Sequence, residues 1–292
     1  MTATAPSGGR HVALVTDSSA CLPAEEVARL GITVVPIVLV WHGIELRDGV
    51  DITPAEFWRR LATDPELPTT STMSPGAYLE AFDVAARQGH GVVCTCLPRR
   101  LSTMYEAALI ARRELDGHVP VDVVETGGAA MACGFPTLLG ARSAAAGADQ
   151  RAVLAAVERA IPHSEILAVI DDLDYLVRSG RVPALVGLVV GAFPSTFVLR
   201  LHNRRIGVGA KFGSRERAIA GMVERVRRRA RGAAYLGITV HHCANVGEAE
   251  TLVATLAREL RPDDLYLTSF TSVMGAHVGP GLTGISFCAL PA

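Results

Sequence analysis

Residues 11–19, HVALVTDSS, have the pattern of a buried β-strand that ends in an acid and two hydroxyls. Residues 22–31, LPAEEVARLG, follow as a helix with proline near its start and glycine at its end. Residues 32–40 are apolar again and predict a second strand. Apolar strands that alternate with helices indicate a parallel sheet covered by helices on both faces. The chain is therefore expected to begin with an α/β domain.

The alternation continues until a change of pattern near Ile161 and Pro162. Further strands are expected at 92–96 and 121–124, and helices at 102–115, 127–146 and 152–160. Beyond this point the sequence predicts a strand at 166–170, a hairpin over 197–210 and a basic helix with Arg225 and Arg227. We expect a disordered tail (1–10), an α/β domain with hydroxyl-rich loops (11–163) and a smaller α+β domain (164–292). The last contains the arginine-rich helix and the loop GAHVGPG (275–281).

A hydroxyl-rich stretch, PTTSTMSPG over residues 68–76, precedes an amphipathic run. Ser74 and Pro75 occupy the N-cap and first-turn positions of the expected helix. Hydroxyls, free backbone N–H groups and the positive end of a helix dipole together suit an anion. A capped turn without a ligand explains the same pattern, so both interpretations stay open at this point.

Three further polar segments follow predicted strands, at residues 17–19, 99–103 and 125–126. The carboxyl ends of parallel strands meet at one edge of a sheet, which is where ligand sites form. We therefore expect these segments and the hydroxyl-rich stretch to converge there.

Composition argues against several classes of partner. The net charge of the 292 residues is −1 and aromatic residues make up 5% of them, which favours neither nucleic-acid binding nor attraction to an anionic membrane. The charge-free run over residues 182–199 contains two prolines, so we interpret it as a buried segment and expect no stable membrane insertion. The first ten residues lack the apolar core of a signal peptide, and we expect a cytoplasmic protein.

The sequence favours neither a metal nor a nucleotide cofactor. The six cysteines form no CxxC pair and are expected to be free thiols, with Cys94 and Cys96 on one face of a strand. Asp171, Asp172 and Asp174 are more typical of a helix start than of a metal cluster. Walker and GxSxG patterns are absent from the sequence, and no GxGxxG pattern follows the first expected strand.

Five motifs in order give the chain a resemblance to the DegV family. They are VTDSS (15–19), TSTMSPG (70–76), LSTMY (101–105), DLDYL with SGRV (172–182) and GAHVGPG (275–281). The resemblance implies a two-domain protein that buries a fatty acid, such as palmitate, and has no cofactor. It also implies that this fatty acid is presented to a separate ATP-dependent fatty acid kinase, which makes an acyl phosphate for phospholipid metabolism. No catalytic residue is then expected in this chain.

The resemblance also assigns residues. Thr70 and Ser102 match the hydroxyls that hold the carboxylate, and Arg181 and His277 match a polar pair near the head group and the kinase-facing mouth. Ser71 and Gly279 are expected in the same vicinity. Candidates for the acyl tunnel are Val93, Met131, Phe135, Leu188 and Phe193.

The chain departs from the family pattern at four positions, Thr72, Met73, Thr103 and Glu125. Two other functions also stay open. A hydrolase or acyl-transfer enzyme would use Ser102 as nucleophile and His277 as base. A lipid-sensing regulatory module would bind another protein through the arginine-rich helix.

Overall fold

The computed structural model describes residues 12–71, 74–87, 91–115, 119–170, 173–180 and 196–292. Its first sheet has four parallel strands in the order β2-β1-β6-β7. The strands are β1 (Ala13–Asp17), β2 (Thr33–Val35), β6 (Val92–Cys96) and β7 (Val121–Glu125). The expected parallel sheet is confirmed, and its carboxyl ends share one edge.

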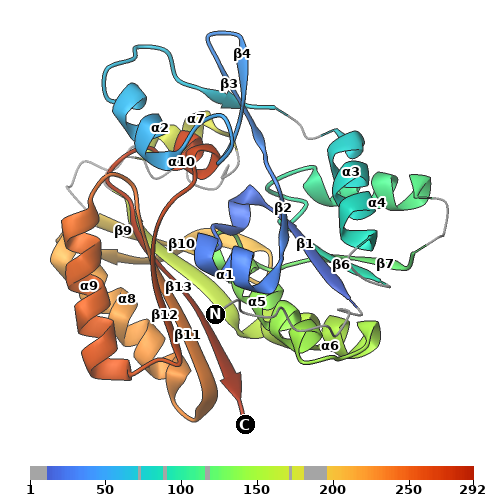
Figure 1. Ribbon diagram of the computed structural model, residues 1–292. Helices are drawn as coiled ribbons and strands as arrows, with labels where there is room; N and C mark the ends of the chain where they lie inside the picture. The colour runs from blue at the N-terminus through green and yellow to red at the C-terminus, as the bar shows by residue number, and fades with distance from the viewer. Residues whose placement is uncertain (1–11, 72–73, 88–90, 116–118, 171–172, 181–195) are drawn as a thin grey trace, which may run out of the picture.

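Helices cover both faces of this sheet (Figure 1). On one face lie α3 (Pro75–Ala86) and α4 (Met104–Glu114), and on the other α1 (Ala24–Leu30), α5 (Met131–Ala145) and α6 (Gln150–Ala160). Alternation along β6 explains the two layers, because Cys94 joins the core with α3 and α4 while Val93 joins the core with α5. Cys94 Sγ and Cys96 Sγ lie 3.7 Å apart on one face, as expected.

The expected single strand over residues 32–40 is wrong, because Pro36 divides it between two sheets. After β2 the chain continues as β3 (Val38–Trp41), which pairs with β4 (Ile44–Arg47) and β5 (Thr69–Thr70) in a small antiparallel sheet. His42 and Gly43 make the turn with φ values of 51° and 74°. Helix α2 (Pro54–Leu61) lies between β4 and β5 in sequence.

The second sheet has six strands in the order β10-β9-β8-β13-β11-β12. They are β8 (Ser164–Ile170), β9 (Thr196–His202), β10 (Arg205–Phe212), β11 (Ala233–His242), β12 (Asp264–Ser269) and β13 (Thr283–Pro291). Helices α8 (Arg215–Ala230) and α9 (Val246–Leu260) cover its outer face (Figure 1). The mixed α/β fold class is therefore confirmed, whereas the domain division at 163/164 stays a prediction.

The GAHVGPG segment is not the loop that we expected. Its first four residues belong to α10 (Ser272–Val278), which packs beside α2 and α7 (Asp174–Arg178). Two short 3-10 helices, η1 (Ser18–Ala20) and η2 (Ile161–His163), complete the described elements. Val273 of α10 joins the core cluster of the first sheet, although α10 follows the second sheet in sequence.

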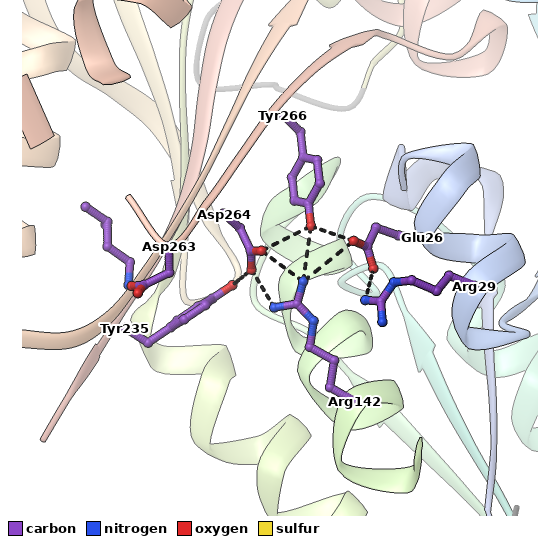
Figure 2. Close-up of polar contacts among 8 residues, drawn as sticks. Glu26, Arg29, Arg142, Tyr235, Asp263, Asp264 and Tyr266 are labelled. Carbon is purple, nitrogen blue, oxygen red and sulfur yellow. Dashed lines mark hydrogen bonds and ion pairs between the residues drawn. The ribbon is translucent and has the colours of Figure 1, made fainter. Parts of the chain in front are cut away.

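A polar network joins the helices of the first sheet to the second sheet (Figure 2). Arg142 on α5 donates to Asp264 on β12 through Nη1 (2.5 Å) and Nη2 (2.9 Å). The Tyr235 hydroxyl donates to the same carboxylate at 2.6 Å, and the Tyr266 hydroxyl donates to Glu26 of α1 at 3.1 Å. The network thus ties α1 and α5 of the first sheet to β11 and β12 of the second.

Candidate functional site

A cavity of about 480 Å³ lies where the two sheets meet, at the edge with the carboxyl ends of β1 and β6. Ligand pockets usually span about 300–1,000 Å³. One part of the lining carries hydroxyl, imidazole and guanidinium groups: Ser19, Thr70, Ser71, Arg99, Arg100, Ser102, Thr103, Ser179 and His277. The other part is apolar: Ile37, Leu97, Leu101, Met104, Ala129, Leu176, Leu201, Ile206, Val273, Met274 and Val278. The cavity therefore suits a molecule with a polar head and an apolar body.

Thr70 and His277 contact each other in the cavity lining, and we call this pair the polar end of the cavity. Thr70 lies on β5, opposite Leu39 of β3, and its neighbour Thr69 is exposed. His277 lies near the end of α10, and its Nε2 is 3.2 Å from Thr70 Oγ1. This pairing crosses 207 positions of sequence and joins the small sheet to α10.

Ser102 lies just before α4, at the positive end of an 11-residue helix. Its N–H donates to Pro98 O at 3.2 Å, and its Oγ accepts the N–H of Met104 at 3.4 Å. Ser102 and Thr70 both line the cavity, so the structure brings the two expected carboxylate contacts to one site.

Ser71 and Gly279 have different surroundings. Ser71 lines the cavity, and its N–H donates to Val38 O at 2.9 Å. Gly279 ends α10 with a φ of 72°, and a Cβ there would lie 2.4 Å from Tyr175 Cδ2. Glycine at 279 thus serves the close packing of α10 on α7.

Several expected positions lie outside the described residues. These are Arg181 at the head group, Leu188 and Phe193 of the acyl tunnel, and the departures Thr72 and Met73.

The three other tunnel candidates are placed in a separate core. Val93, Met131 and Phe135 are fully buried between the first sheet and the layer formed by α5 and α6. They are not among the described residues that line the cavity. The apolar part of the lining comes instead from residues beside the motifs, such as Leu101, Met104 and Leu176. Their adjacency to Ser102 and to the DLDYL segment was the signal that could have identified them.

Three of the four segments expected to converge do so, namely those around Ser19, Thr70 and Ser102. The fourth does not line the cavity. Thr126 is buried and donates to Cys96 O at 2.9 Å, and Glu125 accepts the N–H of Arg99 at 2.8 Å. The fourth segment therefore contacts the loop that carries Arg99 without lining the cavity itself.

A buried acid, Asp17, contacts the lining residue Ser19. Asp17 accepts hydrogen bonds from the N–H of Ser19 (3.0 Å), from the Ser19 hydroxyl and from the Tyr78 hydroxyl (3.4 Å). Burial raises the pKa of Asp17 to about 6, and the hydrogen bonds from Ser19 and Tyr78 oppose the shift. Asp17 thereby orients Ser19, which lines the cavity, while itself staying behind it.

Asp17 is expected to make the protein less stable as the pH rises from 4 to 7. Its folded-state pKa of about 6 exceeds the ordinary value of 3.8 for an aspartate, so the folded state keeps a proton that the unfolded chain has lost. That contribution to stability is complete below about pH 4 and is lost through about pH 6, a change of about 3 kcal/mol. Asp17→Asn has no such titration. The free energy of unfolding of Asp17→Asn minus that of the wild type should therefore increase by this amount as the pH rises from 4 to 7.

Urea unfolding of both proteins at several pH values measures this difference. Asp149→Asn, at the exposed N-cap of α6, is the matched control. Parallel stability curves for Asp17→Asn and the wild type would contradict the assignment.

All six cysteines are buried free thiols, as expected. No group of three or more metal-ligating side chains occurs among the described residues. Within the same residues, no helix is long and apolar enough to cross a bilayer.

Comparisons with known proteins show the family and the fold. The chain matches the family model described as "Uncharacterised protein, DegV family" over residues 11–290. A DegV domain-containing protein of Streptomyces coelicolor is 37% identical over 279 residues, which cover 94% of this chain and 98% of that protein.

Solved structures show the same fold. A structure described as fatty acid binding of a DegV family protein from Thermus thermophilus has a TM-score of 0.87 at 26% identity, and the match covers 96% of this chain and 100% of that one. A structure described as DegV, a fatty acid binding protein from Bacillus subtilis, has a TM-score of 0.87 at 23% identity, with coverages of 96% and 99%. The second likeness shows the fold alone.

Proposed function

The chain belongs to the DegV family, and from this premise we propose that it binds a long-chain fatty acid in the cavity between its two sheets. The carboxylate is held by Thr70 and Ser102, and the acyl chain lies along the apolar lining. The relative from Thermus thermophilus, described as binding a fatty acid, supports this choice of ligand.

The observation that carries the proposal is a single cavity lined both by hydroxyl and imidazole groups and by a larger set of apolar side chains. Thr70, Ser102 and His277 supply hydrogen-bond donors, and the start of α4 adds a positive dipole end. Each methylene buried along the wall contributes about 0.8 kcal/mol. Open grooves of about 530 Å³ between α8 and α9 and about 580 Å³ along β9 and β10 are rimmed by charged residues and suit an acyl chain less well.

We further propose that the protein acts as a carrier and not as an enzyme. It would present the carboxylate to a separate ATP-dependent fatty acid kinase in the cytoplasm, with Arg181 and His277 near the mouth. A carboxylate held by hydroxyls rather than by a buried lysine keeps its oxygens open to phosphorylation. The proposal gives this chain no catalytic residue and no cofactor.

Among the contacts of the described residues given above, none favours either alternative. The described hydrogen bond of His277 Nε2 is to Thr70, and Ser102 Oγ accepts an N–H at the helix start, which does not single out Ser102 as a nucleophile. In the arginine-rich helix, Arg225 is paired with Glu165 and Arg227 with Glu224 and Glu259.

Native mass spectrometry of the purified protein tests the proposed ligand. We expect a mass excess that matches a fatty acid, removable by solvent extraction and restored by palmitate. Thr70→Val should weaken palmitate binding about 10- to 100-fold, since a hydrogen bond to a charged group is worth about 1.5–3 kcal/mol. A protein that carries no acyl species and takes up no palmitate would refute the proposal.

A further inference from the structure

Asp48 is a buried carboxylate that does not line the cavity. It follows β4 and is 2% exposed. Its Oδ2 accepts the Ser18 hydroxyl at 2.8 Å, and its Oδ1 accepts the N–H of Ser272 at 3.0 Å. No ion pair to Asp48 occurs in the part of the chain that the structure describes. A buried carboxylate that has hydrogen bonds but no cation is costly, so its location calls for a role.

Both partners of Asp48 belong to elements that line the cavity. Ser18 precedes the lining residue Ser19, and its Oγ also accepts the N–H of Ile37, another lining residue, at 3.2 Å. Ser272 is the first residue of α10, which contributes His277 to the polar end. One carboxylate therefore joins η1, the connection between β2 and β3, and α10.

The position of Ser272 at the start of α10 determines where His277 lies near the end of the same helix. His277 follows Ser272 by five residues, a rise of about 7.5 Å along a single helix. Gly275 fits against α2 so closely that a Cβ there would lie 2.7 Å from Phe57 and 2.8 Å from Trp58. A small shift at Ser272 therefore cannot be absorbed at Gly275 and must move His277 relative to Thr70.

We propose that Asp48 is a positioning residue for the polar end of the cavity. Its carboxylate fixes the start of α10 against η1, and thereby keeps His277 in hydrogen-bonding range of Thr70. This role rests on the proposed fatty-acid site, because it concerns the residues that would hold the head group.

Electrostatics support the same role. A carboxylate at the first residue of a helix interacts favourably with the positive end of its dipole. Burial raises the pKa of Asp48, and hydrogen bonds from Ser18 and Ser272 oppose that shift by favouring the charged form.

Two variants disturb this contact by different routes. Asp48→Asn keeps the shape of the side chain but removes its charge. Ser272→Pro removes the N–H that Asp48 accepts, at a first helical position that tolerates proline. The preceding residue, Thr271, has φ −64° and ψ 162°, which is compatible with a following proline.

The matched control is Glu165→Gln, which removes another buried carboxylate. Glu165 pairs with Arg200 and Arg225 on the face of the second sheet that is turned toward α8. This control lowers stability without touching η1, α10 or the cavity lining.

The experiment follows the His277 imidazole by nitrogen NMR in the full-length, ligand-free protein, and the rate of palmitate dissociation in the loaded protein. Asp48→Asn and Ser272→Pro should both shift the His277 Nε2 resonance and speed palmitate release about tenfold, whereas Glu165→Gln should do neither. If Ser272→Pro does not fold, Asp48→Asn alone decides. An unchanged His277 resonance, or an equal change in Glu165→Gln, would overturn the inference. Failure of the wild type to bind palmitate would refute the proposed function instead, and the ligand-free resonance would still test Asp48.

Discussion

Phe135→Ala is expected to lower the free energy of unfolding by about 3–5 kcal/mol and to leave palmitate affinity unchanged. Phe135 is fully buried on α5, among Leu14, Leu138 and Val157. A Cβ at Gly237 of β11 would lie 2.4 Å from Phe135 Cε1, so the ring packs directly on the second sheet. Its removal leaves a cavity at the junction of the two sheets that rigid strands cannot fill.

Chemical unfolding and a palmitate titration of the same protein measure both effects. Leu101→Ala, at the apolar lining of the proposed site, is the matched control and should show the larger loss of palmitate affinity. If Phe135→Ala weakens palmitate binding while its stability stays near that of the wild type, Phe135 belongs to an acyl tunnel after all.

Glu165→Ala is expected to cost about 3–5 kcal/mol of stability, because it leaves two arginines without their common partner. Glu165 on β8 has no exposed surface. Its Oε1 accepts Arg200 Nε at 2.8 Å and Arg225 Nε at 2.9 Å, and its Oε2 accepts the second nitrogen of each guanidinium. The carboxylate thus joins β8 to β9 and α8.

The stabilisation by the ion pairs of Glu165 depends on pH. Burial raises the pKa of Glu165, but the hydrogen bonds and charges of Arg225 and Arg200 outweigh it and hold the pKa below its usual value. The stabilisation is therefore present above the unfolded-state pKa of about 4.3 and is lost as the pH falls. The free energies of unfolding of the wild type and of Glu165→Ala should approach each other as the pH falls. A constant difference at all pH values would contradict this account, and Glu224→Ala, whose carboxylate is half exposed, is the control.

The regular elements of the chain were predictable where local pattern and tertiary environment agree. Strand β6 occupies residues 92–96, as expected, because an uninterrupted apolar run flanked by glycine and proline has few alternatives. The motif around Thr70 likewise predicted that its hydroxyl lies at a binding site, and Thr70 lines the cavity.

Elsewhere, contacts between residues that are distant in sequence determined the local structure. The GAHVGPG segment contains three glycines and one proline and therefore has low helix propensity. Helix α10 nevertheless forms, because α2, α7 and the small sheet enclose it. Arg225 was expected only as part of a basic helix, but it binds Glu165, 60 positions away. Phe135 and Met131 were plausible for a tunnel because a buried core helix and a tunnel wall have the same apolar composition.

The central claim, that Thr70 holds the carboxylate of a bound fatty acid, is tested most directly by NMR of palmitate labelled with 13C at its carboxyl. The wild type should give a distinct bound carboxyl signal. Thr70→Val should move this signal and weaken binding about 10- to 100-fold. Thr69→Val, at the exposed neighbouring position on β5, should match the wild type. The same signal and affinity in all three proteins would contradict the claim.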